Sequence, residues 1–144
     1  MKKKFVMVAS ILSIAILFMG SNAMASFNNK YGYDFIVPAY KANVRSTDYY
    51  YRGTGNTQNA WKVALVTSNE PGGNTCSNFW LEVFDGSNVS STRLVQEAAG
   101  DYYTAAYQTA SYASVWLTCE NNNNNNNVYE NTGYWDEETS HDPN

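Results

Sequence analysis

Short segments in which apolar and polar side chains alternate recur along this chain, and this pattern most constrains its fold. In residues 31–37 every second side chain, from Tyr31 to Val37, is aromatic or aliphatic. A period of two places such side chains on one face of a β-strand. Further strands are expected at 49–52, 60–67, 79–84, 89–95, 100–107, 114–120 and 132–137. The sequence therefore predicts an all-β protein, an antiparallel β-sandwich or barrel of about seven to eight short strands.

Composition also favours strands over helices. The chain holds 12 tyrosines and 4 tryptophans, residue types that suit sheets. Leu, Lys, Glu and Arg, the main residues of amphipathic helices, are scarce in the part that follows the first 25 residues. Residues 102–110 are the exception, because their alanines also allow a short helix. Seven asparagines at 121–127 stand between two expected strands and predict a solvated loop rather than an aggregation-prone tract.

The first 25 residues have the pattern of a secretory signal peptide. Lysines at 2–4 precede an uncharged apolar run at 5–19, and Ala23 and Ala25 form a small-x-small cleavage site. The run is shorter than the roughly 20 residues that a membrane span needs, although an uncleaved anchor is the alternative. We therefore expect a secreted protein, extracellular or associated with the cell wall. It would begin at Ser26 and have no membrane contact after cleavage.

Cleavage would leave 119 of the 144 residues, enough for one compact domain. We expect a single β-sandwich domain at 26–135, followed by an acidic polar tail at 136–144. Three of the nine basic residues leave with the signal peptide, so six remain beside thirteen acidic residues and the net charge becomes −7. Such a charge disfavours binding to nucleic acids and to anionic lipid surfaces.

Cys76 and Cys119 are the only two cysteines of the chain. Because a cysteine pair outside the cell is free to oxidise, we expect them to form one disulfide bond. Two separate buried thiols are the alternative interpretation.

The sequence shows no pattern typical of a catalytic or metal site, and we expect a protein that is not an enzyme and needs no cofactor. The single histidine, His141, lies close to the C-terminus, where neither an oriented catalytic imidazole nor a multi-histidine zinc site is expected. Residues 85–96 lack the glycine and the glutamate of a calcium-binding loop.

Two sets of carboxylates leave alternatives open. An acidic cluster in the tail either binds a hard cation such as calcium or is simply solvated, and we expect the solvated form. Its members are Asp136, Glu137, Glu138, His141 and Asp142. A pair of carboxylates for glycoside hydrolysis is the other alternative. The candidates for such a pair are Glu82, Asp85, Glu97, Asp101 and Glu120.

Aromatic residues outnumber what a core of this size needs, and this surplus bears most on function. Consecutive tyrosines at 49–51 must face both sides of a strand, so some rings point outward. Outward rings can bind sugar rings or another protein, or they can pack across strands and stabilise the sheet. The surplus is drawn from Tyr49, Tyr50, Tyr51, Tyr102, Tyr103, Tyr107, Tyr112 and the four tryptophans.

Four segments, at 61–67, 79–83, 100–107 and 133–139, together resemble a known group of proteins. With the leader and the chain length, they resemble an uncharacterised family of small exported proteins from Bacillus-like Gram-positive bacteria. A looser likeness is to lactococcin 972-type bacteriocins. The family resemblance implies a Gram-positive, extracellular origin and brings no activity and no functional residue.

These observations predict a small secreted, non-enzymatic β-sandwich. We expect it to bind a cell-wall glycan or an extracellular protein through exposed tyrosine and tryptophan side chains. A bacteriocin-like secreted antagonist and a small extracellular hydrolase that uses carboxylates are the two alternatives.

Overall fold

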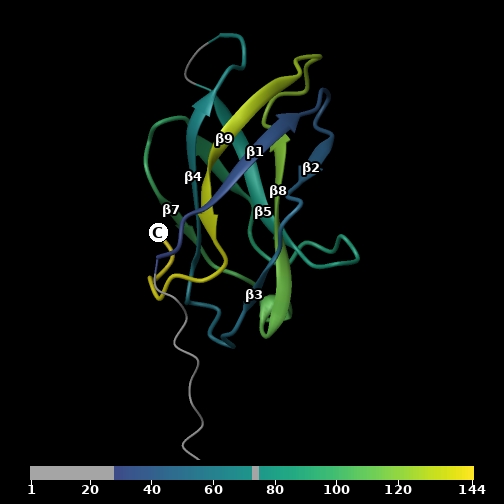
Figure 1. Cartoon of the computed structure of the whole chain (residues 1–144). Coiled ribbons are helices and arrows are strands. Elements are labelled where there is room, and N and C mark those ends of the chain that lie inside the picture. Colours follow the sequence, from purple (N-terminus) through teal and green to yellow (C-terminus); the bar gives the residue numbers. More distant parts are fainter. Residues whose placement is uncertain (1–27, 73–74) are drawn as a thin grey trace, which may run out of the picture.

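The computed structural model describes residues 28–72 and 75–144, which form two antiparallel sheets packed face to face (Figure 1). Sheet 1 has the order β1-β9-β4-β7, with β1 at Tyr31–Val37, β9 at Tyr129–Asp136, β4 at Trp61–Ser68 and β7 at Tyr102–Thr104. Sheet 2 has the order β2-β8-β5-β6, with β2 at Asn43–Arg45, β8 at Ala113–Asn121, β5 at Cys76–Glu82 and β6 at Arg93–Gln96. Strand β3 (Tyr50–Arg52) pairs with the other end of β8. The predicted all-β sandwich is confirmed, with nine strands in the described residues.

The alternation seen in the sequence explains the burial of the longer strands. In β1 the second, fourth and sixth residues are exposed, while Tyr33, Phe35 and Val37 are buried. The predicted hairpin after β5 is present, with β6 as the strand that returns. Residues 102–110 form β7 and a single 3-10 turn, η1 (Gln108–Ala110), so the helical alternative is wrong. The predicted signal peptide and its cleavage site lie outside the described residues.

A ring from sheet 1 links the two sheets through the core. The ring centroid of Tyr33 lies 5.6 Å from that of Phe79 on sheet 2. Its hydroxyl donates a buried hydrogen bond of 2.9 Å to the Ala64 carbonyl, and it reaches that oxygen by passing over Gly133. A Cβ atom at position 133 would lie 2.0 Å from the same carbonyl oxygen. Only glycine at position 133 leaves room for the hydrogen bond between Tyr33 and Ala64.

The two long sides of the sandwich differ. On one side, backbone hydrogen bonds join the sheets, because Ser90 forms a β-bridge with Ala106 and the Tyr107 amide donates to the Val89 carbonyl at 2.8 Å. On the other side, β1 and the segment 44–48 leave a groove of about 420 Å³ between them. The sheets therefore do not close into a barrel. Asp34 is exposed in the middle of the open edge strand, where a charge opposes pairing with a second copy.

The predicted disulfide is wrong. Strands β5 and β8 are neighbours, but their register places Phe79, and not Cys76, opposite Cys119. Cys76 lies three residues away from Phe79, about 10 Å along a strand. It also faces the outer side of the sheet whereas Cys119 faces the core, because successive side chains alternate. A disulfide needs Cα atoms within about 7 Å, so the structure does not join the two thiols.

Candidate functional site

The structure divides the aromatic surplus into an interior and an exterior set. Three tryptophans, Trp61, Trp80 and Trp135, are buried, and Trp116 alone of the four is partly exposed. The tyrosines at 49–51 face both ways as predicted. Tyr50 turns inward and stacks on Tyr31 with ring centroids 3.5 Å apart, while its two neighbours are exposed.

Three exterior rings gather on the outer face of sheet 2, and we call them the ring patch. The centroid of Trp116 lies 4.7 Å from that of Tyr49 and 6.2 Å from that of Phe84. Phe84 is 82 % exposed and Tyr49 is 57 % exposed. The guanidinium of Arg45 lies 5.1 Å over the Trp116 ring and holds it in place. The ring patch is therefore a contiguous apolar surface in which Tyr49 and Phe84 are exposed and Trp116 is partly exposed.

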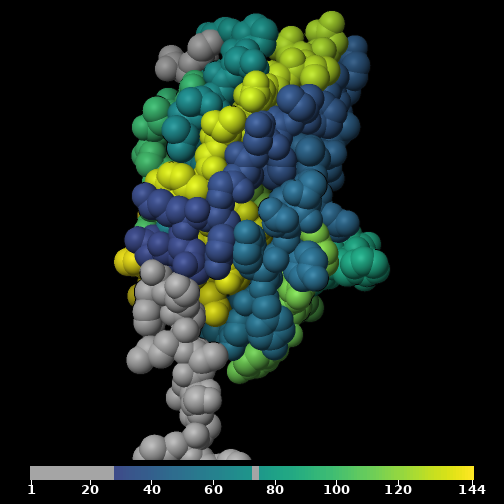
Figure 2. All heavy atoms as spheres, viewed as in Figure 1, coloured from purple at the N-terminus to yellow at the C-terminus, as the bar shows by residue number. Residues whose placement is uncertain are grey.

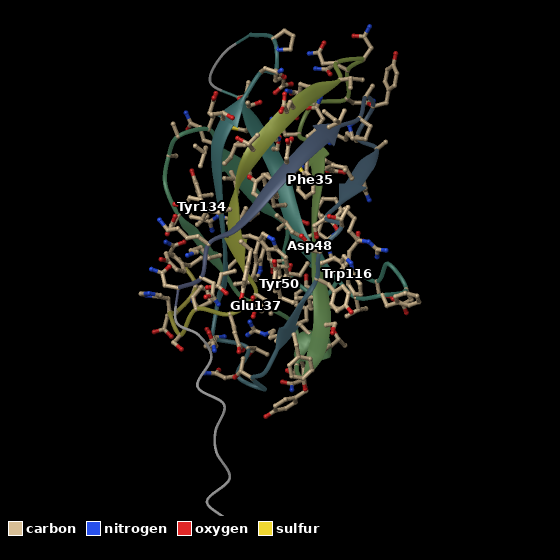
Figure 3. The ribbon with its side chains drawn as sticks, viewed as in Figure 1. Phe35, Asp48, Tyr50, Trp116, Tyr134 and Glu137 are labelled. Atoms are coloured by element: carbon tan, nitrogen blue, oxygen red, sulfur yellow. The ribbon has the colours of Figure 1, made fainter. Side chains whose placement is uncertain are left out.

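Separate parts of the sandwich position these rings. Strand β8 presents Trp116 outward because its neighbours Val115 and Leu117 face the core. Tyr49 directly precedes β3, and Phe84 lies in the hairpin turn after β5. This turn projects from the body of the molecule, at the right in Figure 2, and Figure 3 labels Trp116 beside its base. No single sequence segment contains the patch, so its existence depends on the pairing of the strands.

A hollow of about 350 Å³ adjoins the ring patch, and we call it the polar hollow. It lies over β2, β5, β8 and the hairpin turn, and its walls are mainly amide, hydroxyl and carboxylate groups. The lining residues are Asn43, Trp80, Glu82, Gly86, Asn88, Thr92 and Glu120. Glu82 connects the two features, since it is directly opposite Trp116 in the sheet register.

Hydrogen bonds fix the side chains on this face. The indole nitrogen of Trp80 donates to Glu82 Oε1 at 2.8 Å, and Arg45 Nη1 lies 3.7 Å from Glu82 Oε2. Asn78 Nδ2 donates to Glu120 Oε1 at 2.9 Å. Beneath them the Thr118 hydroxyl is fully buried and has no hydrogen-bond partner among residues 28–72 and 75–144.

Of the five acids considered for hydrolysis, Glu82 and Glu120 both line the polar hollow, and the other three lie elsewhere. Glu82 and Glu120 share the outer face of sheet 2, but the register separates them by four residues, about 13 Å along the strand. Glu97 accepts hydrogen bonds from the end of β4 and from the loop before β5. Asp85 caps its own turn. Asp101 accepts a 2.6 Å hydrogen bond from the Tyr134 hydroxyl on the outer face of sheet 1.

The interpretation of the acidic segment as a solvated tail is wrong for its first residues. Asp136 is fully buried, and Glu137 and Glu138 are less than a tenth exposed. The chain is fixed because the Thr139 amide donates to the Ala60 carbonyl at 3.0 Å and the Ala60 amide donates to His141 at 2.8 Å. His141 and Asp142 are exposed.

A buried cation, Arg52, helps to explain why the acidic segment is buried. Arg52, from β3, is 1 % exposed and donates a 2.6 Å hydrogen bond to the Glu137 carbonyl. Burial, and then the negative charge of Asp136, raise the pKa of Glu137 to about 8. Burial also raises the pKa of Asp136. Tyr50 and Glu137 lie in the same lower part of the molecule in Figure 3.

The described residues offer no metal centre and no membrane span. No group of three or more histidine, cysteine, aspartate or glutamate side chains in 28–72 and 75–144 is arranged to hold a metal ion. In the same residues no helix has the length and apolar character needed to cross a bilayer.

Residues 21–139 match the family described as Protein of unknown function (DUF2712). This chain belongs to the DUF2712 family. The match ends at Thr139, so it includes the buried acidic residues as well as both sheets. Membership in DUF2712 confirms the predicted uncharacterised family, whereas a Gram-positive origin and a bacteriocin likeness stay predictions. None of the curated proteins and none of the solved structures matches the chain.

Proposed function

We propose that this protein is a secreted, non-enzymatic module that binds a carbohydrate polymer of the cell wall through the ring patch. One observation carries the proposal: Tyr49, Trp116 and Phe84 form a contiguous exposed aromatic surface beside a hollow lined with polar groups. Aromatic faces pack well against the C–H faces of sugar rings, and polar side chains at their border can bind the sugar hydroxyls.

The polar hollow favours a sugar over a protein partner. Protein interfaces place their aromatic anchors in a core depleted of charged residues. Here two carboxylates, Glu82 and Glu120, line a hollow directly beside the rings. A ligand rich in hydroxyl groups can use both surfaces at once, because its ring faces are apolar and its edges are polar.

The leader pattern supports the secreted location. Residues 2–25 have the charged, apolar and small-residue regions of a signal peptide. The net negative charge of the remaining chain would prevent non-specific adhesion to anionic surfaces, so that binding would depend on a specific site.

A retention assay on purified wall glycan, stripped of protein and of anionic polymers, tests the proposal. We expect the protein to sediment with the glycan and Trp116→Ala to lose at least about tenfold in affinity, because stacking on one ring contributes of order 1 kcal/mol or more. Tyr40→Ala is the matched control, since this ring is 67 % exposed and its backbone amide donates to the Asn125 carbonyl, in the loop that follows β8. Absence of retention, or equal retention of Trp116→Ala, would overturn the proposal.

A further inference from the structure

The polar hollow carries an unbalanced negative charge. Its seven lining residues include Glu82 and Glu120 and no lysine, arginine or histidine. Arg45, a cation on the same face, pairs with Glu82 at 3.7 Å and donates a hydrogen bond to the Val83 carbonyl at 3.3 Å. The charge of Glu82 is therefore partly neutralised.

Glu120 differs from Glu82 in this respect. Its Oε1 atom accepts a 2.9 Å hydrogen bond from the side-chain amide of Asn78, which is neutral. No lysine or arginine of the described residues forms an ion pair with it. On the neighbouring strand β2, Asn43 is directly opposite Glu120 and lines the same hollow. This end of the hollow thus combines a carboxylate and an amide.

One buried polar group beneath this face has no partner in the described residues. The buried hydroxyl of Thr118 lies between Arg45 and Trp80 in the sheet register and has no hydrogen-bond partner in the described part of the chain. A buried polar group normally has a partner. Thr118 is fully enclosed and does not line the hollow, so a ligand would be held by the rings and by the side chains that line the hollow.

We propose that the ring patch and the polar hollow together select amino sugars whose 2-amino group is free and protonated. A glycan stacked on Trp116 would run along β8 into the hollow, where the ammonium group of a ring farther along the chain would bind Glu120, four residues or about 13 Å from Trp116. Charge-assisted hydrogen bonds of this kind are about twice as strong as neutral ones. An N-acetylated sugar would stack equally well but would lose this ion pair, and an anionic sugar would be repelled. This inference rests on the proposed carbohydrate binding and names its ligand class.

Calorimetric titration with three tetrasaccharides of the same β-1,4 linkage tests the inference. The probes are the tetramers of glucosamine, of N-acetylglucosamine and of glucose, at mildly acidic pH and low salt. We expect the glucosamine tetramer to bind about tenfold more tightly than the other two. The preference should shrink as salt is raised, since the ion pair is at the surface.

Glu120→Gln isolates the carboxylate. The glutamine keeps an oxygen that accepts from Asn78, so the sheet should be unaffected, and we expect the preference for glucosamine to fall to about twofold or less. Glu130→Gln is the matched control, because it removes the same charge from an exposed position on sheet 1. It should leave the preference unchanged.

The outcomes separate the ligand class from the proposed function. Equal binding of the three tetramers, preference for the N-acetylated form, or equal effects of the two glutamine variants would overturn the amino-sugar inference while carbohydrate binding stands. Binding of none of the tetramers, together with no retention on wall glycan, would overturn both.

Discussion

The aromatic rings inside the sandwich and those of the ring patch are made of the same residue types but are held in opposite ways. Tyr33 is enclosed by both sheets, and its hydroxyl is satisfied by a buried carbonyl. Trp116 contacts Tyr49, Phe84 and Arg45 on the outer face of sheet 2 and stays partly exposed. The aromatic residues of this protein therefore divide into two groups, one that stabilises the fold and one that is available to contact a ligand.

This difference predicts that substitutions in the two regions have separable effects. Changes among the interior rings should alter the free energy of unfolding, because close-packed interiors tolerate neither added nor missing atoms. Changes in the ring patch should alter binding and leave unfolding nearly unchanged, because exposed rings lose little on truncation.

The largest expected effect is on the interior side of the comparison. Gly133→Ala would place a Cβ atom 2.0 Å from the Ala64 oxygen and 2.5 Å from the Tyr33 hydroxyl oxygen. We expect a loss of about 3 kcal/mol or more in the free energy of unfolding, measured by urea denaturation. Gly32→Ala is the control, since its Cβ would meet its nearest atom only at 4.0 Å. Equal stability of the two variants would contradict this account of the core.

A third group of rings lies at the rim of the sandwich, beside a carboxyl group that should make the free energy of unfolding depend on pH. Tyr31 and Tyr50 stack beside Glu137, whose pKa is about 8 in the folded protein against 4.5 for the ordinary group. The folded state therefore keeps a proton that the unfolded chain releases, and stability is lost as the pH rises from 4.5 to 8.

Melting temperatures measured by circular dichroism across this pH window check the effect. Glu137→Gln imitates the protonated carboxyl and should flatten the profile, with the gain over the native protein largest at the alkaline end. The exposed Glu130 provides the control, because Glu130→Gln should follow the native profile. A native profile that rises with pH would show that Glu137 is ionised in the folded state.

Removal of one tyrosine hydroxyl from the interior and one from the ring patch compares the two regions directly, with a smaller expected change in the free energy of unfolding. Tyr33→Phe deletes the buried hydrogen bond to Ala64 and should lower the free energy of unfolding by about 1 kcal/mol. Tyr49→Phe deletes an exposed hydroxyl and should change it by no more than a few tenths. Parallel denaturant titrations measure both, and a loss for Tyr49→Phe as large as that for Tyr33→Phe would remove the distinction.

The smallest expected effect concerns the two thiols. Because Cys76 and Cys119 face opposite sides of sheet 2, a reducing agent should leave the melting temperature unchanged. Alkylation of the denatured, unreduced protein should label both cysteines, as mass spectrometry would show. A single disulfide-linked species would require a different register of β5 and β8.

Local features of the chain could be predicted because backbone geometry sets them. The inward side chains of β1 and of β8, and the division of the tyrosines at 49–51 between two faces, follow from a period of two. Strand β2 could not be found in this way, since three residues are too few to show alternation. The ring patch was visible only as an unassigned surplus, because its rings come from three separate segments.

The sequence by itself determined an all-β chain, the positions of most strands and the fact that some rings must face outward, because each of these depends on neighbouring residues. The tertiary structure decided which rings gather around Trp116, why Cys76 cannot reach Cys119 and how Arg52 brings Glu137 into the interior. These outcomes depend on strand register and on contacts between residues far apart in the chain. A pattern of alternation specifies a face but not the partner that the face will meet.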